Sequence, residues 1–374
     1  MTEIGSRIQA TGTASIDSAE DLAKVYTPGV ADAVRAIADD PAKARELTTR
    51  RDAVAVVSDG SAVLGLGDVG ALAALPVLEG KAALFHRFAG LNAWPLCVNS
   101  RDVDGLVDAI AAASTGFAAI NLEDIAAPRC FDVDRKLGER LDIPVFHDDQ
   151  HGTAIVVLAG LRNAFRVTGH ELTRERVVIA GAGAAGSAIA RLLRHVGVDD
   201  VVVCDSKGAL HPGRDDLSGE KKWLADNTNP RRVDESLPDA LADAGVFLGV
   251  SVGGLLDGDD LAGMSADAIV FALANPDPEV DLDQAAEHAA VVASGRSDRP
   301  NQINNVLAFP GVLRGLVDSG SGTLSLDAQR AAAEALADVV SADDLGPDHI
   351  VPGVFDEGLH DAVAEAVVRA AKGS

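Results

Sequence analysis

Residues 176–205 constrain the fold of this chain more than any other stretch of its sequence. An apolar run leads into three glycines with the spacing G-x-G-x-x-G, and a helical pattern then covers residues 187–196. The glycines are Gly181, Gly183 and Gly186. Between a strand and a helix, this spacing lets the backbone approach a pyrophosphate, which then rests on the helix N-terminus. The stretch therefore predicts a Rossmann-type dinucleotide-binding domain.

The acidic residue after the next predicted strand bears on the choice between NAD and NADP. That strand covers residues 200–204 and ends in Asp205. A carboxylate at this place binds the ribose 2′-hydroxyl of NAD, whereas Lys207 is placed to meet the 2′-phosphate of NADP. Ala184 and Ala185 complete the expected cofactor-binding turn. The sequence therefore leaves both cofactors open.

Three more strands are expected in this domain, at residues 245–249, 268–274 and 290–293. The second ends in Asn275-Pro-Asp-Pro-Glu, at the carboxyl edge of the sheet, where the nicotinamide should lie. Further on, Asn304 and Asn305 precede an apolar segment. Because asparagine is common in turns, a purely structural explanation of these residues stays open.

Two acidic pairs follow two apolar runs in the first half of the chain. Glu123 and Asp124 come directly after the first run, and Asp148 and Asp149 come shortly after the second. For either pair alone, a helix N-cap or a solvated loop is a common explanation. If the runs are neighbouring parallel strands, however, the carboxylates point into one crevice and repel each other without a cation. Oxygen ligands without a Cys/His set favour Mg²⁺ or Mn²⁺.

Two single residues have side chains suited to proton transfer. Lys81 lies in an otherwise apolar helical pattern, in a chain with eight lysines and twenty-four arginines. Burial would lower its pKa and make it a general base, although a lysine that extends along a helix surface to solvent also fits. Tyr26 is the only tyrosine and lies at a turn made by Pro28 and Gly29. Its side chain fits either a packing role or a phenolic acid.

The order of the predicted elements indicates a two-domain α/β protein. Strands and helices alternate over residues 53–146, which predicts a small parallel α/β layer ahead of the Rossmann domain. We expect an N-terminal substrate- and metal-binding domain over residues 1–151 and a Rossmann NAD(P)-binding domain over 152–305. The mostly helical residues 306–374 are expected to pack back on the first domain.

Composition and charge exclude some classes of partner. The net charge of −25 argues against binding to nucleic acids or anionic membranes, since both require a basic surface. The three cysteines lack metal-ligand spacing and are expected to be core residues in a reducing compartment. No apolar segment at the N-terminus resembles a signal peptide, and no later apolar run reaches 18 residues. We therefore expect a cytoplasmic protein.

Eight segments of the chain together resemble the malic enzymes, in their short microbial form. They are Tyr26-Thr-Pro-Gly-Val-Ala, Val63-Leu-Gly-Leu-Gly-Asp-Val-Gly, Glu79-Gly-Lys-Ala, Ile120-Asn-Leu-Glu-Asp-Ile, Phe146-His-Asp-Asp-Gln-His-Gly-Thr-Ala, Gly181-Ala-Gly-Ala-Ala-Gly, Ala274-Asn-Pro and Asn304-Asn-Val. The resemblance spans most of the chain and implies oxidative decarboxylation of L-malate to pyruvate and CO₂. The same resemblance implies reduction of NAD(P)⁺, a divalent metal, and decarboxylation of oxaloacetate as an accompanying activity.

The resemblance also implies a role for each candidate catalytic residue. Lys81, with Asp148 nearby, would remove the proton of the C2 hydroxyl while hydride passes to the nicotinamide. Tyr26 would then protonate C3 of enolpyruvate. Asn275 and Asn305 would orient malate and the nicotinamide ring.

The metal ligands implied by the resemblance are Glu123, Asp124 and Asp149, and the metal would stabilise the enolate left by CO₂. One position departs from the family pattern. Larger members carry an arginine for a substrate carboxylate just before the Leu-Gly-Leu-Gly segment, where this chain has Ala62. Because the family is typically oligomeric, the resemblance also implies a homodimer, and a neighbouring subunit is one source of the missing cation.

Two other functions remain open at this point. Another two-domain NAD(P)-dependent dehydrogenase, of the amino-acid or shikimate type, would share the architecture and a catalytic lysine but would not require the metal carboxylates. A non-catalytic nucleotide-sensing protein would keep the glycines of the dinucleotide turn, but it would not use Lys81 and Tyr26 together.

Overall fold

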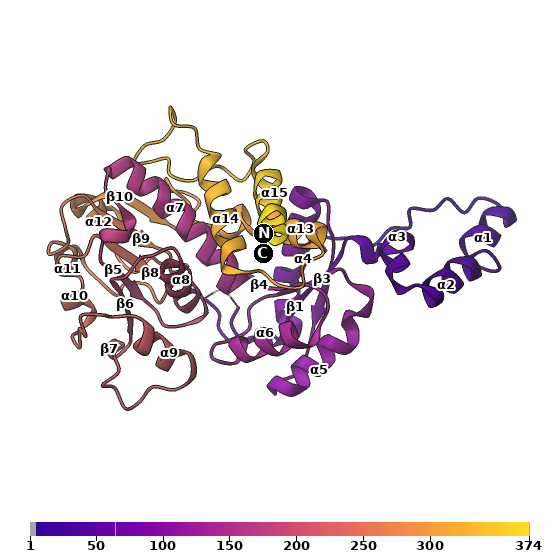
Figure 1. Cartoon of the computed structure of the whole chain (residues 1–374), viewed down its shortest axis with the longest axis horizontal. Coiled ribbons are helices and arrows are strands. Elements are labelled where there is room, and N and C mark those ends of the chain that lie inside the picture. Colours follow the sequence, from indigo (N-terminus) through magenta and orange to yellow (C-terminus); the bar gives the residue numbers. More distant parts are fainter. Residues whose placement is uncertain (1–4, 64, 374) are drawn as a thin grey trace.

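Two β-sheets form the framework of the protein, and helices pack on both (Figure 1). The computed structural model describes residues 5–63 and 65–373. Over these residues the strands are β1 (Ala53–Ser58), β2 (Asn92–Cys97), β3 (Ala119–Leu122), β4 (Val145–His147), β5 (Val177–Ala180), β6 (Val201–Asp205), β7 (Gly208–Ala209), β8 (Val246–Gly249), β9 (Ala268–Ala272) and β10 (Ala289–Ser294).

The α-helices lie before, between and after the strands of the two sheets. They are α1 (Ala19–Val25), α2 (Val30–Asp39), α3 (Ala44–Leu47), α4 (Ala71–Ala89), α5 (Val103–Ala113), α6 (Arg129–Arg140), α7 (Thr153–Thr168), α8 (Ala184–His195), α9 (Gly219–Asn227), α10 (Leu237–Ala240), α11 (Gly258–Leu261), α12 (Leu282–His288), α13 (Phe309–Ser319), α14 (Leu326–Asp338) and α15 (Leu359–Lys372). Among the helices described, none is both long enough and apolar enough to cross a membrane.

The first sheet has four parallel strands in the order β2-β1-β3-β4. All six residues of β1 are buried, as expected for an apolar, β-branched strand with helices on both faces. On one face α4 buries a stripe of side chains from Ala74 to Phe85, and on the other face α5 and α6 pack in a separate apolar cluster. This order makes β3 and β4 neighbours, as the two acidic pairs of the sequence require.

The second sheet confirms the Rossmann prediction. Its strand order is β10-β9-β8-β5-β6-β7, and every strand except β7 runs parallel to its neighbours. β5, the glycine turn, α8 and β6 follow one another as the spacing of the glycines predicts. The strand order reverses at β5, because β6 lies on one side of it and β8 on the other, and ligands bind at such switch points.

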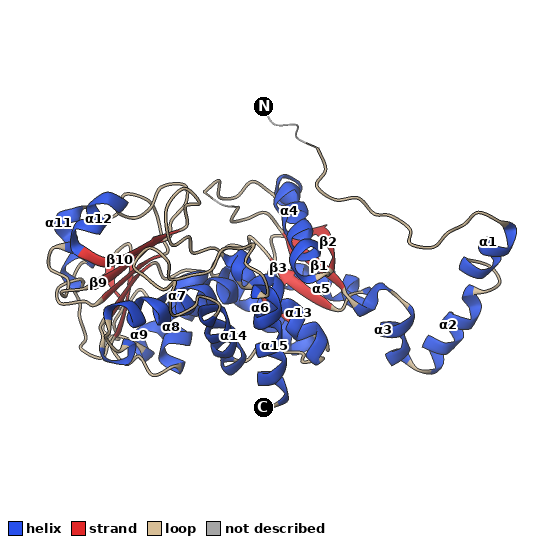
Figure 2. Cartoon of the chain, turned by 90° about the horizontal axis from the view of Figure 1, so that it is seen from above, coloured by secondary structure: helices blue, strands red, loops and turns tan. Residues whose placement is uncertain are grey.

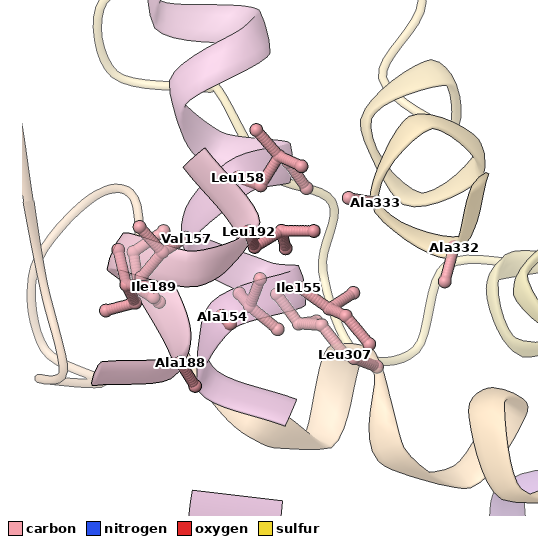
Figure 3. Close-up of a cluster of buried hydrophobic side chains, with 14 of the residues drawn as sticks. Ala154, Ile155, Val157, Leu158, Ala188, Ile189, Leu192, Leu307, Ala332 and Ala333 are labelled. Atoms are coloured by element: carbon pink, nitrogen blue, oxygen red, sulfur yellow. The ribbon is translucent and has the colours of Figure 1, made fainter. Parts of the chain in front are cut away.

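Helix α7 connects the two sheets and is buried along most of its length. In Figure 3 its side chains Ala154, Ile155, Val157 and Leu158 lie among those of α8, with Ala332 and Ala333 of α14 on one side of the group. An apolar helix with contacts on several sides must be buried, which explains why this segment carries so few charged residues. Through α7, the Rossmann domain and the C-terminal helices share one hydrophobic core.

The C-terminal helices return to the first sheet, as expected from the sequence. Figure 1 shows α13 and α15 beside α4 at the first sheet, with α14 on the side toward the second sheet. Phe309 of α13 packs against Phe85 of α4, with 4.8 Å between the ring centroids. The domain boundaries at residues 151 and 305 stay a prediction.

Helices α1, α2 and α3 form an arm that extends away from the rest of the protein (Figure 1 and Figure 2). None of the three helices contains a buried residue. The large apolar side chains exposed on α1, α2 and the turn between them are Leu22, Val25, Tyr26, Val30 and Val34. The arm is fastened at its base, where Arg45 donates a hydrogen bond of 2.7 Å to the carbonyl oxygen of Val317.

The sequence missed several short elements. It gave no sign of β7 or of helices α9 to α12, because these are too short for a periodic pattern. Helix α7 is preceded by a π-helical turn, η4 (Asp148–Gly152), which carries the second acidic pair.

Candidate active site

The two acidic pairs meet at the carboxyl edge of the first sheet. β3 and β4 are parallel neighbours in which Leu122 lies opposite His147. The residue that follows each strand is therefore the first of an acidic pair: Glu123 follows β3, and Asp148 follows β4. Because the strands are parallel and in this register, the carboxylates are brought together by the sheet itself.

Three of the carboxylates form a cluster that fits a divalent cation. One oxygen each of Glu123, Asp124 and Asp149 lies within 4.8 Å of the others, with the first two residues buried and the third half-buried. The backbone N–H of Asp124 donates to Asp149 Oδ2 at 3.1 Å, and Asn121 Nδ2 donates to Glu123 Oε2 at 3.1 Å. Asp124 has a φ of 54°, a strained conformation that persists where surrounding structure fixes it.

The electrostatics of this cluster favour a bound cation. Burial and then the Asp148 charge raise the pKa of Asp149 to about 6. Burial also raises the pKa of Glu123 well above its usual range, although Lys81 opposes the shift. Carboxylates held this way are costly to ionise alone, and a hard divalent metal with oxygen ligands removes that cost. The donor set fits Mg²⁺ or Mn²⁺.

Lys81 of α4 lies against this cluster, with a side chain only 14% exposed. Its Nζ is hydrogen-bonded to Asp148 Oδ2 and lies 3.3 Å from Glu123 Oε2. It also lies 4.1 Å from the ring centroid of Phe309, which packs under it from α13. The structure thus places the one candidate base beside the candidate metal ligands.

The sequence-based expectation of a lowered pKa for Lys81 is wrong for the protein without a metal. Burial does lower the pKa, as expected, but the charges of Asp148 and Glu123 outweigh burial and the net direction is upward. The sequence showed only the apolar neighbours of Lys81 within α4. The carboxylates come from two distant strands, and their effect needed the folded structure.

Asp148 is also held in place by Asn305, which Thr153 orients in turn. Asn305 Nδ2 donates to Asp148 Oδ2 at 3.2 Å, and Thr153 Oγ1 donates to Asn305 Oδ1 at 3.1 Å. Among the residues described, Asp148 Oδ1 has no hydrogen-bond partner. A side chain at Gly152 would meet that oxygen at 2.1 Å, so only glycine leaves room for it. The sequence analysis identified Asn305 but missed Thr153 and Gly152, although both lie in the quoted Phe146 segment.

Asn275 lies across from the glycine-rich segment of the first domain. A side chain added at Gly65 would stand 3.3 Å from the carbonyl oxygen of Asn275. The Asn275 side chain is exposed and donates, at 3.3 Å, to the carbonyl oxygen of Leu273 in its own loop. The structure therefore brings Asn275 to the boundary between the domains, where a substrate and a nicotinamide would meet.

Glu279 is a residue of this region that the sequence analysis passed over. It is fully buried and accepts hydrogen bonds from the backbone N–H of Ser251 at 2.7 Å and of Ala274 at 2.9 Å. Burial raises its pKa despite these two donors. Glu279 thereby links the loop after β8 to the loop after β9. The sequence feature that could have indicated this role is its place as the acidic residue at the end of the segment Asn275-Pro-Asp-Pro-Glu.

Of the three candidate catalytic residues, Tyr26 alone lies away from this cluster within the described chain. It follows α1 in the arm, its side chain is 67% exposed, and Figure 1 shows the arm at the far end of the molecule from the Rossmann domain. The turn at Pro28 and Gly29 makes it project, as the sequence predicts. Within one chain, Tyr26 does not complete the site.

A cavity of about 900 Å³ lies at the glycine turn of the Rossmann domain, with Gly181, Gly183 and Asp205 in its wall. Gly181 has a φ of 122°, and a side chain there would meet the carbonyl oxygen of Val250 at 2.6 Å. A side chain at Gly186 would lie 1.8 Å from the carbonyl oxygen of Gly181. Both positions therefore require glycine, and Gly183 opens on the cavity in front of Ala184 and Ala185, the first residues of α8. The turn fits a dinucleotide pyrophosphate.

Known proteins share both halves of this arrangement. The family model of the malic enzyme N-terminal domain matches residues 5–102, and that of the malic enzyme NAD-binding domain matches residues 150–372. The NAD-dependent malic enzyme of Geobacillus stearothermophilus is 48% identical over 373 residues, which cover 99% of this chain and 78% of that protein. A bifunctional malic/malolactic enzyme of Bacillus subtilis is also 48% identical, over 98% of this chain and 90% of its own length.

Solved structures agree with these sequence matches. The NAD-dependent malic enzyme of Thermotoga maritima superimposes with a TM-score of 0.93 at 43% identity and covers 96% of both chains. The malic enzyme of Pyrococcus horikoshii gives a TM-score of 0.94 at 42% identity, over 98% of this chain and 87% of that one. Matches of this identity and coverage, in both domains, establish the relationship. The chain belongs to the malic enzyme family.

Proposed function

We propose that the protein oxidises L-malate with NAD(P)⁺ and decarboxylates the product to pyruvate and CO₂, with a divalent metal bound. The observation that carries this function is the position of Lys81, between Asp148 and Glu123 at the edge of a three-carboxylate cluster. A dehydrogenase of the amino-acid or shikimate type has no use for that cluster, and a nucleotide sensor has no use for the base.

The metal would be held by Glu123, Asp124 and Asp149, whose oxygens lie together at the carboxyl edge of β3 and β4. When bound, a divalent cation supplies positive charge that polarises the C2 oxygen of malate and stabilises the enolate formed by loss of CO₂. Asn121 and the backbone of Asp124 orient two of the ligand carboxylates by their hydrogen bonds.

The chain's own residues carry the proton transfers and the positioning. The neutral amine of Lys81 would accept the proton of the C2 hydroxyl, after its ammonium form, which Asp148 and Glu123 favour, has released a proton. Asp148 holds the amine in place through their hydrogen bond. When bound at the glycine turn, NAD(P)⁺ would supply the hydride acceptor. Asn305, itself fixed by Thr153, and Asn275 orient the substrate and the ring. Oxaloacetate that is added directly needs no oxidation, and its decarboxylation would use the same groups as the second half of the malate reaction.

We further propose a homodimer in which the arm of one subunit delivers Tyr26 to the site of the other. Helices α1 and α2 of the arm have no buried residue, and they expose several large apolar side chains. Exposure of such a group to water is unfavourable, so a contact with a second subunit would stabilise it. Tyr26 stands among these side chains, and the phenol is the acid that C3 of enolpyruvate requires. Exchange of the arms would bury the apolar side chains and bring the Tyr26 phenol to the partner's site. A two-fold axis would make the exchange the same in both directions.

A cytoplasmic location is also proposed. Its support is chemical: the three cysteines are unpaired thiols, two of them buried, which suits a reducing compartment. The substrate and the cofactor proposed here are those of soluble metabolism.

The function is tested by following reduced nicotinamide and pyruvate in the same reactions. With L-malate and Mn²⁺ we expect both products to form in equal amounts, with NAD⁺ or NADP⁺ as oxidant. EDTA should abolish the reaction, and excess Mn²⁺ should restore it, because the carboxylate cluster cannot act without its cation. Oxidation of malate that persists in EDTA, or reduction without pyruvate, would assign the site to another dehydrogenase.

Replacing Asp149 with asparagine separates metal binding from folding. In EDTA, the melting temperature of Asp149→Asn should exceed that of the wild type, because one of the mutually repelling carboxylates is removed. With Mn²⁺ the order should reverse, since only the wild type gains stability from the ion. Activity should fall by about 100-fold or more, given that a metal supplies several kcal/mol of transition-state stabilisation. Asp132→Asn, a surface change on α6, is the control and should alter neither property.

A further inference from the structure

A cavity of about 170 Å³ lies at the base of the arm. Its wall includes Arg45 of α3 and Arg50 of the 3₁₀ turn that follows, η2 (Thr49–Arg51). The rest of the wall comes from residues just before β3, from residues just before β4 and from the C-terminal end of α13. Figure 1 and Figure 2 show α3 where the arm joins the rest of the protein.

This cavity is separate from the candidate active site. Phe117 and Ala118 of its wall precede β3, whereas Glu123 of the carboxylate cluster follows that strand. The four residues of β3 therefore separate the two places, by about 13 Å at about 3.3 Å per residue. The cavity lies at the amino edge of the first sheet, and the carboxylate cluster lies at the carboxyl edge.

Arg50 has few partners for an arginine whose side chain is only 23% exposed. Among the residues described, its Nε is buried without a hydrogen-bond partner. Its Nη2 lies 4.0 Å from Asp142 Oδ1, which is too far for a hydrogen bond. Asp142 is itself 90% exposed, so solvent screens its charge. Because buried donors are normally satisfied, the Arg50 guanidinium is suited to an acceptor from outside the chain.

Arg45 brings a second guanidinium to the same cavity. Its hydrogen bond to the carbonyl oxygen of Val317 uses one of its five donors, and a cation near the end of α13 also interacts favourably with the helix dipole. Within the part of the chain that the structure describes, Arg45 forms no ion pair. In a protein with 57 acidic and 32 basic side chains, two arginines with so little carboxylate around them are unusual. Their charge attracts an anion.

The size and the remaining wall of the cavity limit the kind of anion. An apolar cavity of about 150 Å³ in another protein holds benzene, so a nucleotide is too large for this one. Several apolar side chains line it: Phe117, Ile143, Pro144, Leu316 and Val317. A guanidinium binds a carboxylate through two parallel hydrogen bonds, and an apolar wall suits a short carbon chain.

We propose that Arg45 and Arg50 bind the carboxylate of a short-chain organic acid, whose carbon chain lies on the apolar wall. The bound acid connects α3 and η2 to the C-terminal end of α13, and it thereby fastens the base of the arm to the first domain. This inference goes beyond the proposed function and does not depend on it, because neither arginine takes part in the malate reaction.

Thermal melting of the whole chain in EDTA tests the site without turnover. The probe is sodium butyrate, which has the same number of non-hydrogen atoms as benzene. It should raise the melting temperature above that in NaCl of equal concentration, because it binds the folded chain and not the unfolded one. Butyramide has nearly the same shape without the charge and should give no such rise. Sodium phosphate stabilises proteins in general, so it should act equally on the wild type and on the arginine variants.

Two substitutions remove the binding groups singly. Arg50→Lys keeps the charge but loses the planar pair of donors, and Arg45→Gln loses the charge. Each should weaken butyrate binding by about tenfold, the effect of one charge-assisted hydrogen bond. Each variant is compared with itself in NaCl, so a lower stability of the variant does not affect the result. Arg51→Gln is the control, since Arg51 is the neighbour of Arg50 but is 72% exposed and does not line the cavity.

Amide hydrogen exchange then locates the bound acid. Butyrate should slow exchange at residues 44–51 and leave the residues around Lys81 unchanged. A rise in melting temperature that persists in both arginine variants, or slowed exchange around Lys81 in place of the arm, would overturn the proposal and assign butyrate to the active site. A response to phosphate that needs the two arginines would overturn the choice of a carboxylate. If butyrate has no effect and the arginine variants lower the mass measured by light scattering, the arginines bind a second subunit and the proposal fails.

Discussion

Replacing Lys81 with alanine is expected to lower kcat for malate oxidation by about a thousandfold or more, since a positioned general base alone contributes roughly 10²–10⁴-fold. The amine is hydrogen-bonded to Asp148 and lies 3.3 Å from Glu123, next to the proposed metal site, where the C2 hydroxyl of malate would lie. No other lysine contacts this cluster among the residues described. The measurement is kcat at saturating malate, cofactor and Mn²⁺.

The Lys81→Ala change also affects folding, so a second variant is needed. Removing one partner of a buried ion pair costs about 3–5 kcal/mol, because the other charge stays behind. Lys81→Arg keeps the positive charge beside Asp148 but cannot release a proton. It should melt close to the wild type and be as inactive as the alanine variant. Lys136→Ala, which removes a lysine from a surface pair with Asp104, should behave as wild type.

Small primary amines give a third readout. Added to Lys81→Ala, they should restore part of the rate, and the restored rate should depend on the pKa of the amine, as general base catalysis requires. A purely structural lysine would give no such dependence. If Lys81→Arg oxidises malate at the wild-type rate, the assignment of Lys81 as the base is wrong.

The parts of this site that the sequence predicted are those fixed by local pattern. A side chain would clash at Gly181 or Gly186, and at Gly183 it would extend into the cavity. Because these positions require glycine, their spacing can be recognised in the sequence alone. The acidic pairs were predicted to meet because each follows an apolar run, and parallel strands end at one edge. In both cases the information lies within a few residues of the feature that it predicts.

The parts that were missed depend on residues far apart in the chain. The pKa of Lys81 moves upward because carboxylates from β3 and β4 approach α4, a contact that no periodicity of α4 contains. Asp205 matched the position of a ribose acceptor, but Arg214 and Lys221 return to it from later segments and occupy its oxygens. A sequence pattern gives the type of a residue and its place in an element; it does not give the neighbours that set its charge.

Mixing two inactive variants in one dimer is expected to restore activity. Tyr26→Phe alone should lower the rate of pyruvate formation by roughly 10²–10⁴-fold, the usual contribution of a general acid. In a dimer of one Lys81→Ala chain and one Tyr26→Phe chain, exchanged arms place both changes in one site and leave the other intact. Such a dimer, purified through a different tag on each chain, should show about half of the wild-type activity.

The same experiment has a matched control within the site. Lys81 and Asp148 are hydrogen-bonded in one chain, so a mixed dimer of Lys81→Ala and Asp148→Asn carries one defect in each site and should stay inactive. Restored activity in the first pair but not in the second requires that Tyr26 act across the subunit boundary. If the first pair stays inactive while light scattering shows a dimer, Tyr26 serves its own chain, and the arm must fold back onto it. If the mass is that of one chain, the exposed arm belongs to no dimer and the exchange proposal fails.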